Sequence, residues 1–528
     1  MQESHAFQLS RTQRVHGIDV MGTDVARFSH KLQTGEPVTV AIIGASVAQN
    51  AGCIDQPGRR CMNYNGRTGN VTLSWGEPRT RPFKGFLVRW FEWMNATWPH
   101  SRHRLLNFGR DAQPIQRLLP CIYAYVPSDV DIVFLEVGSM YMWFDAVSVE
   151  ATVRQLALLR PRPAIAFVTV ALWCRCIPYC RNTPAYGVSN LPARKEQNLL
   201  RPEDPMQDHL DTALATICQT YSCSSLSMRR ALNASVYAKH PGFTIPELAQ
   251  DCLHPVHGSR GVDYVTDMLV HWTKHAVAAR VQIDPALSMP ATQLPRPVWR
   301  AAPRVAQRPA VCLDLGRLGS RGTSNGQRLL TVPWHTTRCE GSMPASTSDG
   351  CGAEPSLTSA CAARLSGTRV CNDWDTSVEC PSTWPMPGFM PPPVWFFCTH
   401  SLGAGLLHRE EAQRKESPGV VALQPGAQLF LPLELPFASN SSLVSISVSH
   451  LVSYQGMGQA ALRCVSGCAC ETQQIDAHNA TLGYSLFASH TFEAVTSTKA
   501  CMLLITLRNA TSSGGTKFKV RDVQAWAL

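Results

Sequence analysis

The chain has 528 residues, 45% of them hydrophobic, and carries 48 basic against 38 acidic side chains, a formal net charge of +10. This length exceeds what one hydrophobic core supports, so we expect two domains with connecting segments. The basic residues are spread along the chain, which argues against nucleic-acid binding, and no run of about eighteen apolar residues predicts a transmembrane span.

The first element with a clear pattern is a buried strand. Residues 1–35 are polar and are expected to form a loosely packed N-terminal extension. From Val38 to Ile43 the chain is apolar and β-branched, as in a parallel strand covered on both faces. Gly44 permits a sharp turn after this strand and would present Ser46 at the carboxyl end of the sheet, where α/β proteins place their chemistry.

Strands and helices then alternate up to residue 284. A glycine- and arginine-rich loop at 57–76 precedes a helix at 83–94, whose aromatic residues share one face. The alternation predicts an α/β domain at 36–284, in which helices cover both faces of a mainly parallel sheet. Its further strands are expected at 132–135, 164–170 and 224–228, and its further helices at 147–159, 209–220 and 262–278.

The remainder of the chain has a different character. Between 285 and 393 the periodicity fades and proline, serine, arginine and cysteine accumulate, which indicates a linker or an insertion stapled by disulfides. From 394 to 528, short apolar runs are separated by turn residues and predict a C-terminal antiparallel β-sandwich. Its strands are expected at 420–422, 428–433, 443–448, 460–464, 485–487, 500–507 and 518–520.

Asp251 and His254 offer the groups that a nucleophilic serine requires. A serine hydroxyl is a poor nucleophile at neutral pH, so it needs a histidine that takes its proton and a carboxylate that orients this histidine. The two residues are three positions apart, so their side chains can lie side by side while the imidazole reaches Ser46. Pro255 disfavours a helical backbone at His254 and therefore predicts a loop there.

These motifs, in this order, resemble the sequence blocks of the SGNH hydrolases, also called GDSL esterases and lipases, over about residues 36–280. Gly44-Ala45-Ser46 is similar to the first block, Asn107-Phe108-Gly109 to the second, and Asp251-Cys252-Leu253-His254 to the last. The resemblance implies a three-layer αβα, flavodoxin-like domain. It also implies a triad of Ser46, His254 and Asp251, with an oxyanion hole that uses the N–H groups of Ser46 and Gly109.

The third block departs from the family pattern. Gly138 matches its glycine, but Met140 replaces the asparagine whose amide would complete the oxyanion hole. Methionine donates no hydrogen bond, and losing one donor costs roughly 10²–10³ in rate. Either Ser139 or Tyr141 substitutes, or the site works slowly with two donors, or catalysis is lost. The rival α/β-hydrolase fold would need a glycine in place of Ala48, and acid and histidine on separate loops.

Twenty cysteines, many of them in irregular segments, and six N-glycosylation sequons predict a disulfide-bonded protein of the secretory pathway. Cysteine clusters at 174–180 and 464–470 resemble zinc ligands, but neither has a partner cluster with finger spacing, so no metal is predicted. The first residues show no signal peptide, which a truncated start, a larger precursor or a misassigned first exon would explain. The sequons lie at Asn70, Asn95, Asn233, Asn440, Asn479 and Asn509.

The motifs together predict a serine esterase that needs no cofactor and removes O-acyl groups, acetyl in the first place, from a polysaccharide or glycoprotein. A sugar hydroxyl in place of water would make the same triad an O-acyltransferase. A catalytically silent glycan-binding protein of the same fold is the alternative from another class, supported by Met140. Glu136, on the strand beside the site, is either a buried acid with a raised pKa or, as we prefer, a satisfied structural hydrogen-bond acceptor.

Overall fold

The computed structural model forms two compact units, Met1–Gln307 and Arg308–Leu528. The division between them falls inside the segment 285–393 that the sequence predicts as a linker or insertion. The structure describes residues 8–49, 54–56, 59–60, 63–64, 71–72, 85–109, Ile115, Leu119, 121–139, 144–173, 205–249, 253–255, 260–278, 294–299, 310–314, 322–324, 327–329, 369–371, 395–400, 416–435, Ala438, 441–481 and 485–528.

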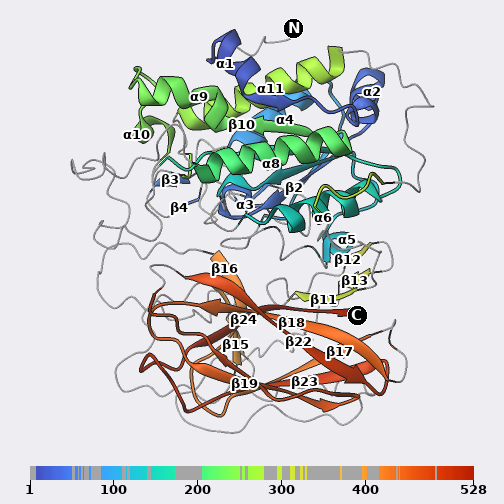
Figure 1. The fold of residues 1–528 in the computed structure, drawn as a ribbon, viewed down its shortest axis with the longest axis vertical. Helices are drawn as coiled ribbons and strands as arrows, with labels where there is room; N and C mark the ends of the chain where they lie inside the picture. Colours follow the sequence, from blue (N-terminus) through green and yellow to red (C-terminus); the bar gives the residue numbers. More distant parts are fainter. Residues whose placement is uncertain are drawn as a thin grey trace. The chain divides into compact units, whose positions relative to one another are not determined.

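The first unit is built on one six-stranded sheet (Figure 1). Its strands, in spatial order, are β1 Ile18–Val20, β10 Ser224–Ser227, β9 Ala164–Thr169, β8 Ile132–Glu136, β2 Thr39–Gly44 and β7 Arg104–Asn107. The five strands from β10 to β7 are parallel, and β1 is antiparallel at the edge. Every residue of β2, β8 and β9 is buried, as expected for central strands covered on both faces.

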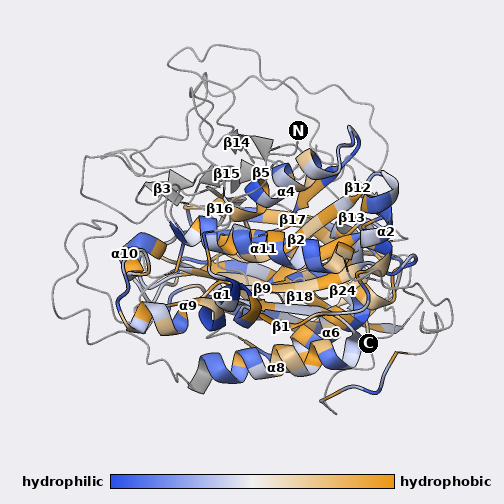
Figure 2. Ribbon diagram, turned by 90° about the horizontal axis from the view of Figure 1, so that it is seen from above, coloured by the Kyte–Doolittle hydropathy of each residue, from blue (hydrophilic) through white to orange (hydrophobic). Residues whose placement is uncertain are grey.

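Helices cover both faces of this sheet. They are α1 Arg11–His16, α2 Ala26–Thr34, α3 Ser46–Gln49, α4 Phe86–Thr97, α5 Ile122–Tyr125, α6 Ala146–Ala157, α8 Pro205–Tyr221, α9 Met228–Tyr237, α10 Ile245–Leu248 and α11 Arg260–Ala278. Helices α6 and α8 pack together on one face, and α11 packs with α2 and α4 on the other (Figures 1 and 2). The predicted fold class, an α/β domain followed by a β-sandwich, is confirmed.

The aromatic stripe of α4 contributes to the core, as its helical spacing predicts. The ring of Trp90 contacts the ring of Phe134 edge-on, with centroids 5.0 Å apart, and Phe134 also meets Trp272 of α11 at 5.9 Å. All three side chains are fully buried. In Figure 2 the strands are coloured mainly hydrophobic, whereas the helices alternate hydrophobic and hydrophilic residues, so apolar helix faces close the core on the sheet.

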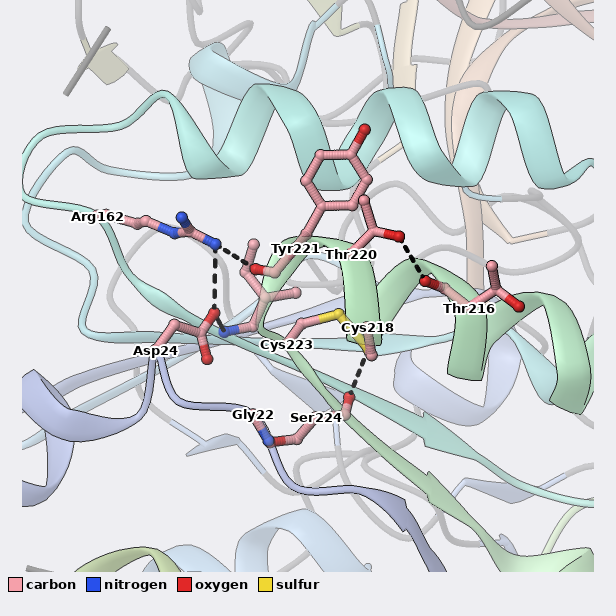
Figure 3. Close-up of a disulfide and its surroundings, with 10 residues drawn as sticks. Gly22, Asp24, Arg162, Thr216, Cys218, Thr220, Tyr221, Cys223 and Ser224 are labelled. Carbon is pink, nitrogen blue, oxygen red and sulfur yellow. Dashed lines mark hydrogen bonds and ion pairs between the residues drawn. A yellow bond between two sulfur atoms is a disulfide. The ribbon is translucent and has the colours of Figure 1, made fainter. Parts of the chain in front are cut away.

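Residues 8–35, the described part of the predicted N-terminal extension 1–35, are not loosely packed as we expected. They contribute α1, the edge strand β1 and α2, and Phe28 and Leu32 of α2 are fully buried. Asp24 accepts a hydrogen bond from the Ile165 N–H at 3.2 Å (Figure 3). The expectation failed because only one residue in three or four of α2 is apolar, so the segment is polar overall although one helix face is buried.

A disulfide links Cys218 in the last turn of α8 to Cys223, the residue before β10 (Figure 3). It closes the short connection by which the helix returns to the sheet. In the same region Arg162 donates to the backbone carbonyl of Tyr221 and lies 3.9 Å from the Asp24 carboxylate. These contacts tie α8, β9 and the N-terminal segment into one packed unit.

Part of the predicted linker is anchored on the first unit. The fully buried carboxylate of Glu150, on α6, accepts hydrogen bonds from the N–H groups of Val298 at 2.6 Å and Trp299 at 3.2 Å. Arg154, one turn further along the helix, donates to the carbonyl of Pro295 at 2.7 Å.

Two short hairpins lie in or beside the predicted loop 57–76: β3 Ile54–Gln56 with β4 Arg59–Arg60, and β5 Asn63–Tyr64 with β6 Val71–Thr72.

The second unit is a sandwich of two sheets. The smaller sheet consists of β17 Gln428–Glu434, β23 Ala500–Leu507, β19 Gln459–Ser466 and β21 Gln473–Asp476, all antiparallel. The larger sheet contains β11 Ala310–Asp314, β12 Gly322–Ser324, β13 Gln327–Leu329, β14 Arg369–Cys371, β15 Trp395–His400, β16 Glu416–Ala422, β18 Ser442–Val452, β20 Cys468–Ala469, β22 Leu486–Thr496 and β24 Phe518–Ala527. Side chains of both sheets form one hydrophobic core.

Several features of the sandwich differ from the sequence prediction: β15, β20 and β21 were not expected, and the strand expected at 518–520 continues to Ala527. The strand expected at 485–487 continues to Thr496, because its later residues alternate buried and exposed positions instead of forming an apolar run. Strands β11 to β14 lie inside the segment 285–393, and β11 pairs with β24, so this segment supplies part of the sheet.

The cysteine cluster at 464–470 forms disulfides. Cys464 is bonded to Cys470, and Cys468 is bonded to Cys501. The second of these bonds joins β20 of the larger sheet to β23 of the smaller sheet. The cluster at 174–180 lies outside the described residues.

Among the helices that the structure describes, none combines the length and apolar character that a membrane crossing requires.

Candidate active site

Ser46 lies where the sequence predicts it, directly after the carboxyl end of β2. It is the first residue of the short helix α3 and is half-buried. Gly44 is required here for space: a Cβ at this position would lie 2.7 Å from the Glu136 carbonyl oxygen and 2.8 Å from the Ala48 Cβ. Its φ is not positive, so the close approach of α3 and β8, rather than a left-handed turn, explains the glycine.

His254 lies in a loop between α10 and α11, as Pro255 predicts. The loop is closed at its base by an isolated antiparallel bridge between Ala249 and Pro255. Its far end is fixed where α11 starts, because Gly261 lies so close to α10 that a Cβ there would stand 2.0 Å from the Leu248 carbonyl oxygen. Pro255, next to His254, is therefore paired with Ala249, the residue that follows α10.

The structure brings Ser46 and His254 together. The Oγ of Ser46 lies 2.8 Å from the Nε2 of His254, although 208 positions separate the two residues in the sequence. In this arrangement neutral His254 can accept the serine proton through Nε2, which leaves Nδ1 as the ring atom that an orienting carboxylate would contact. Asp251, the residue expected to orient the ring, lies outside the described residues, as do Met140 and Tyr141.

Gly109 lies beside the helix that carries Ser46. A Cβ on this residue would stand 2.3 Å from the Gln49 nitrogen and 2.6 Å from the Ala48 carbonyl carbon, so only glycine fits. Its N–H donates to Asn107 Oδ1 at 2.8 Å, while Asn107 Nδ2 donates to the carbonyl of Ala48 at 2.7 Å. Asn107, part of the second sequence block but given no role of its own by the sequence analysis, thus connects the predicted oxyanion donor to α3.

Ser139 is already bonded in this structure. Its N–H donates to Glu136 Oε1 at 2.9 Å and its hydroxyl donates to Glu136 Oε2 at 2.5 Å, and both residues are buried. Ser139 is one of the two residues that could replace the missing asparagine as an oxyanion donor. In the structure it is held in place by Glu136 and turned toward it.

Glu136 has both of the properties that its sequence position offered as alternatives, a raised pKa and a structural role as hydrogen-bond acceptor. It is a satisfied hydrogen-bond acceptor, and its burial raises the pKa of the carboxyl group to about 7. The Ser139 hydrogen bonds and the nearby His254 oppose this rise in pKa because they favour the charged carboxylate.

No protein-family model matches the chain, and no curated protein matches it either. Among solved structures, a two-domain esterase (CEX) active on acetylated mannans, co-crystallised with mannopentaose, is similar at 13% identity and a TM-score of 0.49, with 99% of both chains covered. The acetylxylan esterase Axe2 of Geobacillus stearothermophilus, a catalytic mutant, is 13% identical at a TM-score of 0.30, over 45% of this chain and 94% of that one.

Proposed function

We propose that the chain is a serine esterase of the SGNH type that removes O-acyl groups, above all acetyl groups, from a polysaccharide or glycoprotein. The observation that carries this proposal is the 2.8 Å contact between Ser46 Oγ and His254 Nε2 at the carboxyl edge of a parallel sheet. A serine and a histidine in hydrogen-bond contact at this edge are the minimum that nucleophilic acyl transfer requires. We assign the catalytic domain to residues 36–284 and to the N-terminal elements packed on it.

The reaction would proceed in two halves. Ser46 attacks the ester carbonyl carbon while His254 takes its proton, and the tetrahedral intermediate collapses to an acyl-enzyme as His254 returns the proton to the departing sugar hydroxyl. Water, activated by His254, then attacks the acyl-enzyme and releases the carboxylic acid together with free Ser46. Asp251 is the proposed orienting acid.

The N–H groups of Ser46 and Gly109 are the proposed oxyanion donors. In the structure the Gly109 N–H donates to Asn107 Oδ1, so the oxyanion would have to share or replace this acceptor.

The test is acetate release from acetylated mannan and acetylated xylan, the polysaccharides on which the two similar esterases act, beside p-nitrophenyl acetate as a generic ester. The protein is produced through an oxidising secretory route, and Ser46→Ala serves as the paired variant. Acetate release that disappears in the variant supports the esterase. Equal release by both proteins would overturn the proposal.

A second candidate function is supported by the hydrogen bonds that the candidate oxyanion donors already make within the protein. Because Ser139 is bonded to Glu136 and the Gly109 N–H is bonded to Asn107, a protein that keeps the fold but binds glycans without hydrolysis is the alternative. Absence of activity in both folded proteins, together with retention on an acetylated-glycan matrix, would favour it. Acetyl transfer to an added oligosaccharide instead of water would identify an O-acyltransferase.

We expect N-glycosylation to reveal the compartment, since a secretory protein with exposed sequons acquires N-glycans. Asn95, Asn479 and Asn509 are exposed, whereas Asn233 is half-buried on α9. Expression in a eukaryotic secretory host should therefore give a mass loss on treatment with peptide N-glycosidase. The triple replacement of the three exposed asparagines by glutamine should remove most of this loss, and an unglycosylated secreted protein would contradict the expectation.

We expect Gly109→Ala to lower kcat for ester hydrolysis by about 10²-fold or more, because the added Cβ forces the backbone of α3 or of Gly109 to move. Steady-state kinetics with p-nitrophenyl acetate measures the effect, and thermal unfolding reports any loss of stability. Gly35→Ala is the control without a steric clash: no atom lies within 4 Å of the added Cβ, so kcat should not change, although the positive φ of 72° should cost some stability. A Gly109→Ala enzyme with the wild-type kcat would argue against this loop as part of the site.

A further inference from the structure

Asn107 carries a buried amide at the carboxyl end of β7, beside the strand that leads to Ser46. It is the last residue of β7, pairs in register with Ile42 of β2 and is 4% exposed. The N–H of the next residue, Phe108, donates to the carbonyl of Ile42 at 2.8 Å. Sheet pairing therefore holds Asn107 firmly beside β2. The reaction as proposed above gives this side chain no role.

The nitrogen end of the amide is bonded to α3. Nδ2 of Asn107 donates to the carbonyl of Ala48 at 2.7 Å and lies 3.4 Å from the carbonyl oxygen of Gln49. The last carbonyls of a helix receive no hydrogen bond from within the helix, so Asn107 supplies a donor that α3 cannot supply itself. Since α3 has only four residues and begins at Ser46, a bond at its end also restrains the nucleophile.

The oxygen end of the same amide is bonded to Gly109. The Gly109 N–H donates to Oδ1 of Asn107 at 2.8 Å and closes a turn of the kind that asparagine favours. Gly109 itself packs on α3, where an added Cβ would stand 2.3 Å from the Gln49 nitrogen. One planar side chain thus joins the Gly109 loop to α3, with a donor at one end and an acceptor at the other.

We propose that Asn107 is a positioning residue of the esterase site, whose amide holds the Gly109 loop against α3 and so fixes the place of Ser46 relative to that loop. The inference rests on the proposed function. Asn107 takes no part in the proton transfer, which runs from Ser46 Oγ to His254 Nε2 and then to the leaving sugar oxygen.

The first test is the replacement Asn107→Ala, which removes both bonds of the amide. We expect kcat for p-nitrophenyl acetate to fall on the order of 10²-fold, because a displacement of about 1 Å at a reacting group costs that much. KM should stay within about twofold, since binding of the small ester does not depend on the alignment of the nucleophile. Rates are measured well below the temperature at which the variant unfolds. A folded variant with the wild-type kcat would overturn the proposal.

The second test is the pH dependence of Asn107→Asp, which keeps the shape of the side chain. The ionised carboxylate still accepts the Gly109 N–H but has no hydrogen for the Ala48 carbonyl, whereas the protonated carboxyl offers both a donor and an acceptor. Burial beside uncharged backbone groups should raise the pKa of the introduced carboxyl above that of an exposed aspartate.

We therefore expect the ratio of the variant's kcat to the wild-type kcat to be close to one at acid pH and to fall on the order of 10²-fold as the pH rises through this pKa. The titration of His254 is common to both enzymes and cancels in the ratio. A ratio that does not change with pH would overturn the proposal. This test also serves if Asn107→Ala does not fold.

The matched control is Gln13→Glu. Gln13 also uses both ends of its amide: Oε1 accepts from the Ser10 N–H at 3.0 Å, and Nε2 donates to Ser235 Oγ at 3.1 Å. These bonds join α1 to α9 rather than to α3. The kcat ratio of this variant should stay near one at every pH. A pH-dependent fall like that of Asn107→Asp would show a general effect of an added carboxylate and overturn the assignment.

Failure of this inference is distinguishable from failure of the proposed function. If hydrolysis depends on Ser46 but the Asn107 variants match the wild type, only the inference fails. If no hydrolysis depends on Ser46, the esterase is rejected, and hydrogen exchange of peptides that contain Gly109 tests the bond without activity. Asn107→Ala should speed exchange of the Gly109 N–H, and unchanged exchange would overturn the positioning role as well.

Discussion

Alanine at Ser46 or at His254 is expected to lower kcat for ester hydrolysis by roughly 10⁴–10⁶-fold, and alanine at both positions is expected to lower it no further. The reason is the direct contact between Ser46 Oγ and Nε2 of His254. The serine is reactive only while the imidazole accepts its proton, so the two side chains act as one unit and their losses are not additive. Single-turnover kinetics with p-nitrophenyl acetate measures the three variants.

The control for this experiment is His240→Ala. His240 is exposed in the turn after α9, and its backbone rather than its ring makes the contact to Ser235. Its replacement should leave kcat within about twofold of the wild type, since exposed substitutions away from the site change little. Losses at Ser46 and His254 that simply multiply in the double variant would indicate two independent effects and contradict a nucleophile–base pair.

Replacement of both Cys468 and Cys501 by alanine is expected to lower the free energy of unfolding of the sandwich by about 4 kcal/mol. The bond closes a sequence separation of 33 residues and joins the larger sheet to the smaller one. Without it, the unfolded chain gains the entropy that this closed loop had removed, which destabilises the folded sandwich. Denaturant unfolding followed by tryptophan fluorescence or circular dichroism measures the change.

The matched control is the alanine pair at Cys464 and Cys470. This bond spans only 6 residues and should cost about 2 kcal/mol by the same loop-entropy argument. Equal losses for the two pairs would contradict the loop-entropy explanation. Loss of folding in the Cys468 and Cys501 variant alone would show that the connection between the sheets contributes more than the entropy of the loop.

Periodic patterns in the sequence were sufficient for most of the α/β fold. The strand at 39–44 and the helices at 146–157 and 260–278 lie within a few residues of the ranges predicted for them. A fully apolar strand and a long helix with one apolar face each carry a strong local signal. Residues 8–35 and the later half of β22 were missed because their buried residues are spaced among polar ones, and only contact with β10 or with the other strands of the sandwich gives them a buried face. The strand β7 and the helix α9 were also not predicted.

The sequence by itself determined which residue types were available for catalysis: Ser46 after a buried strand, His254 before a proline, and the order of the two. The tertiary structure decided what these residues contact. It places Ser46 Oγ 2.8 Å from His254 Nε2, and it commits Ser139 to Glu136 and the Gly109 N–H to Asn107. Hydrogen bonds between residues far apart in the chain depend on how the strands align side by side and how the loops close over them. This alignment is set by packing of the whole sheet rather than by any local sequence pattern.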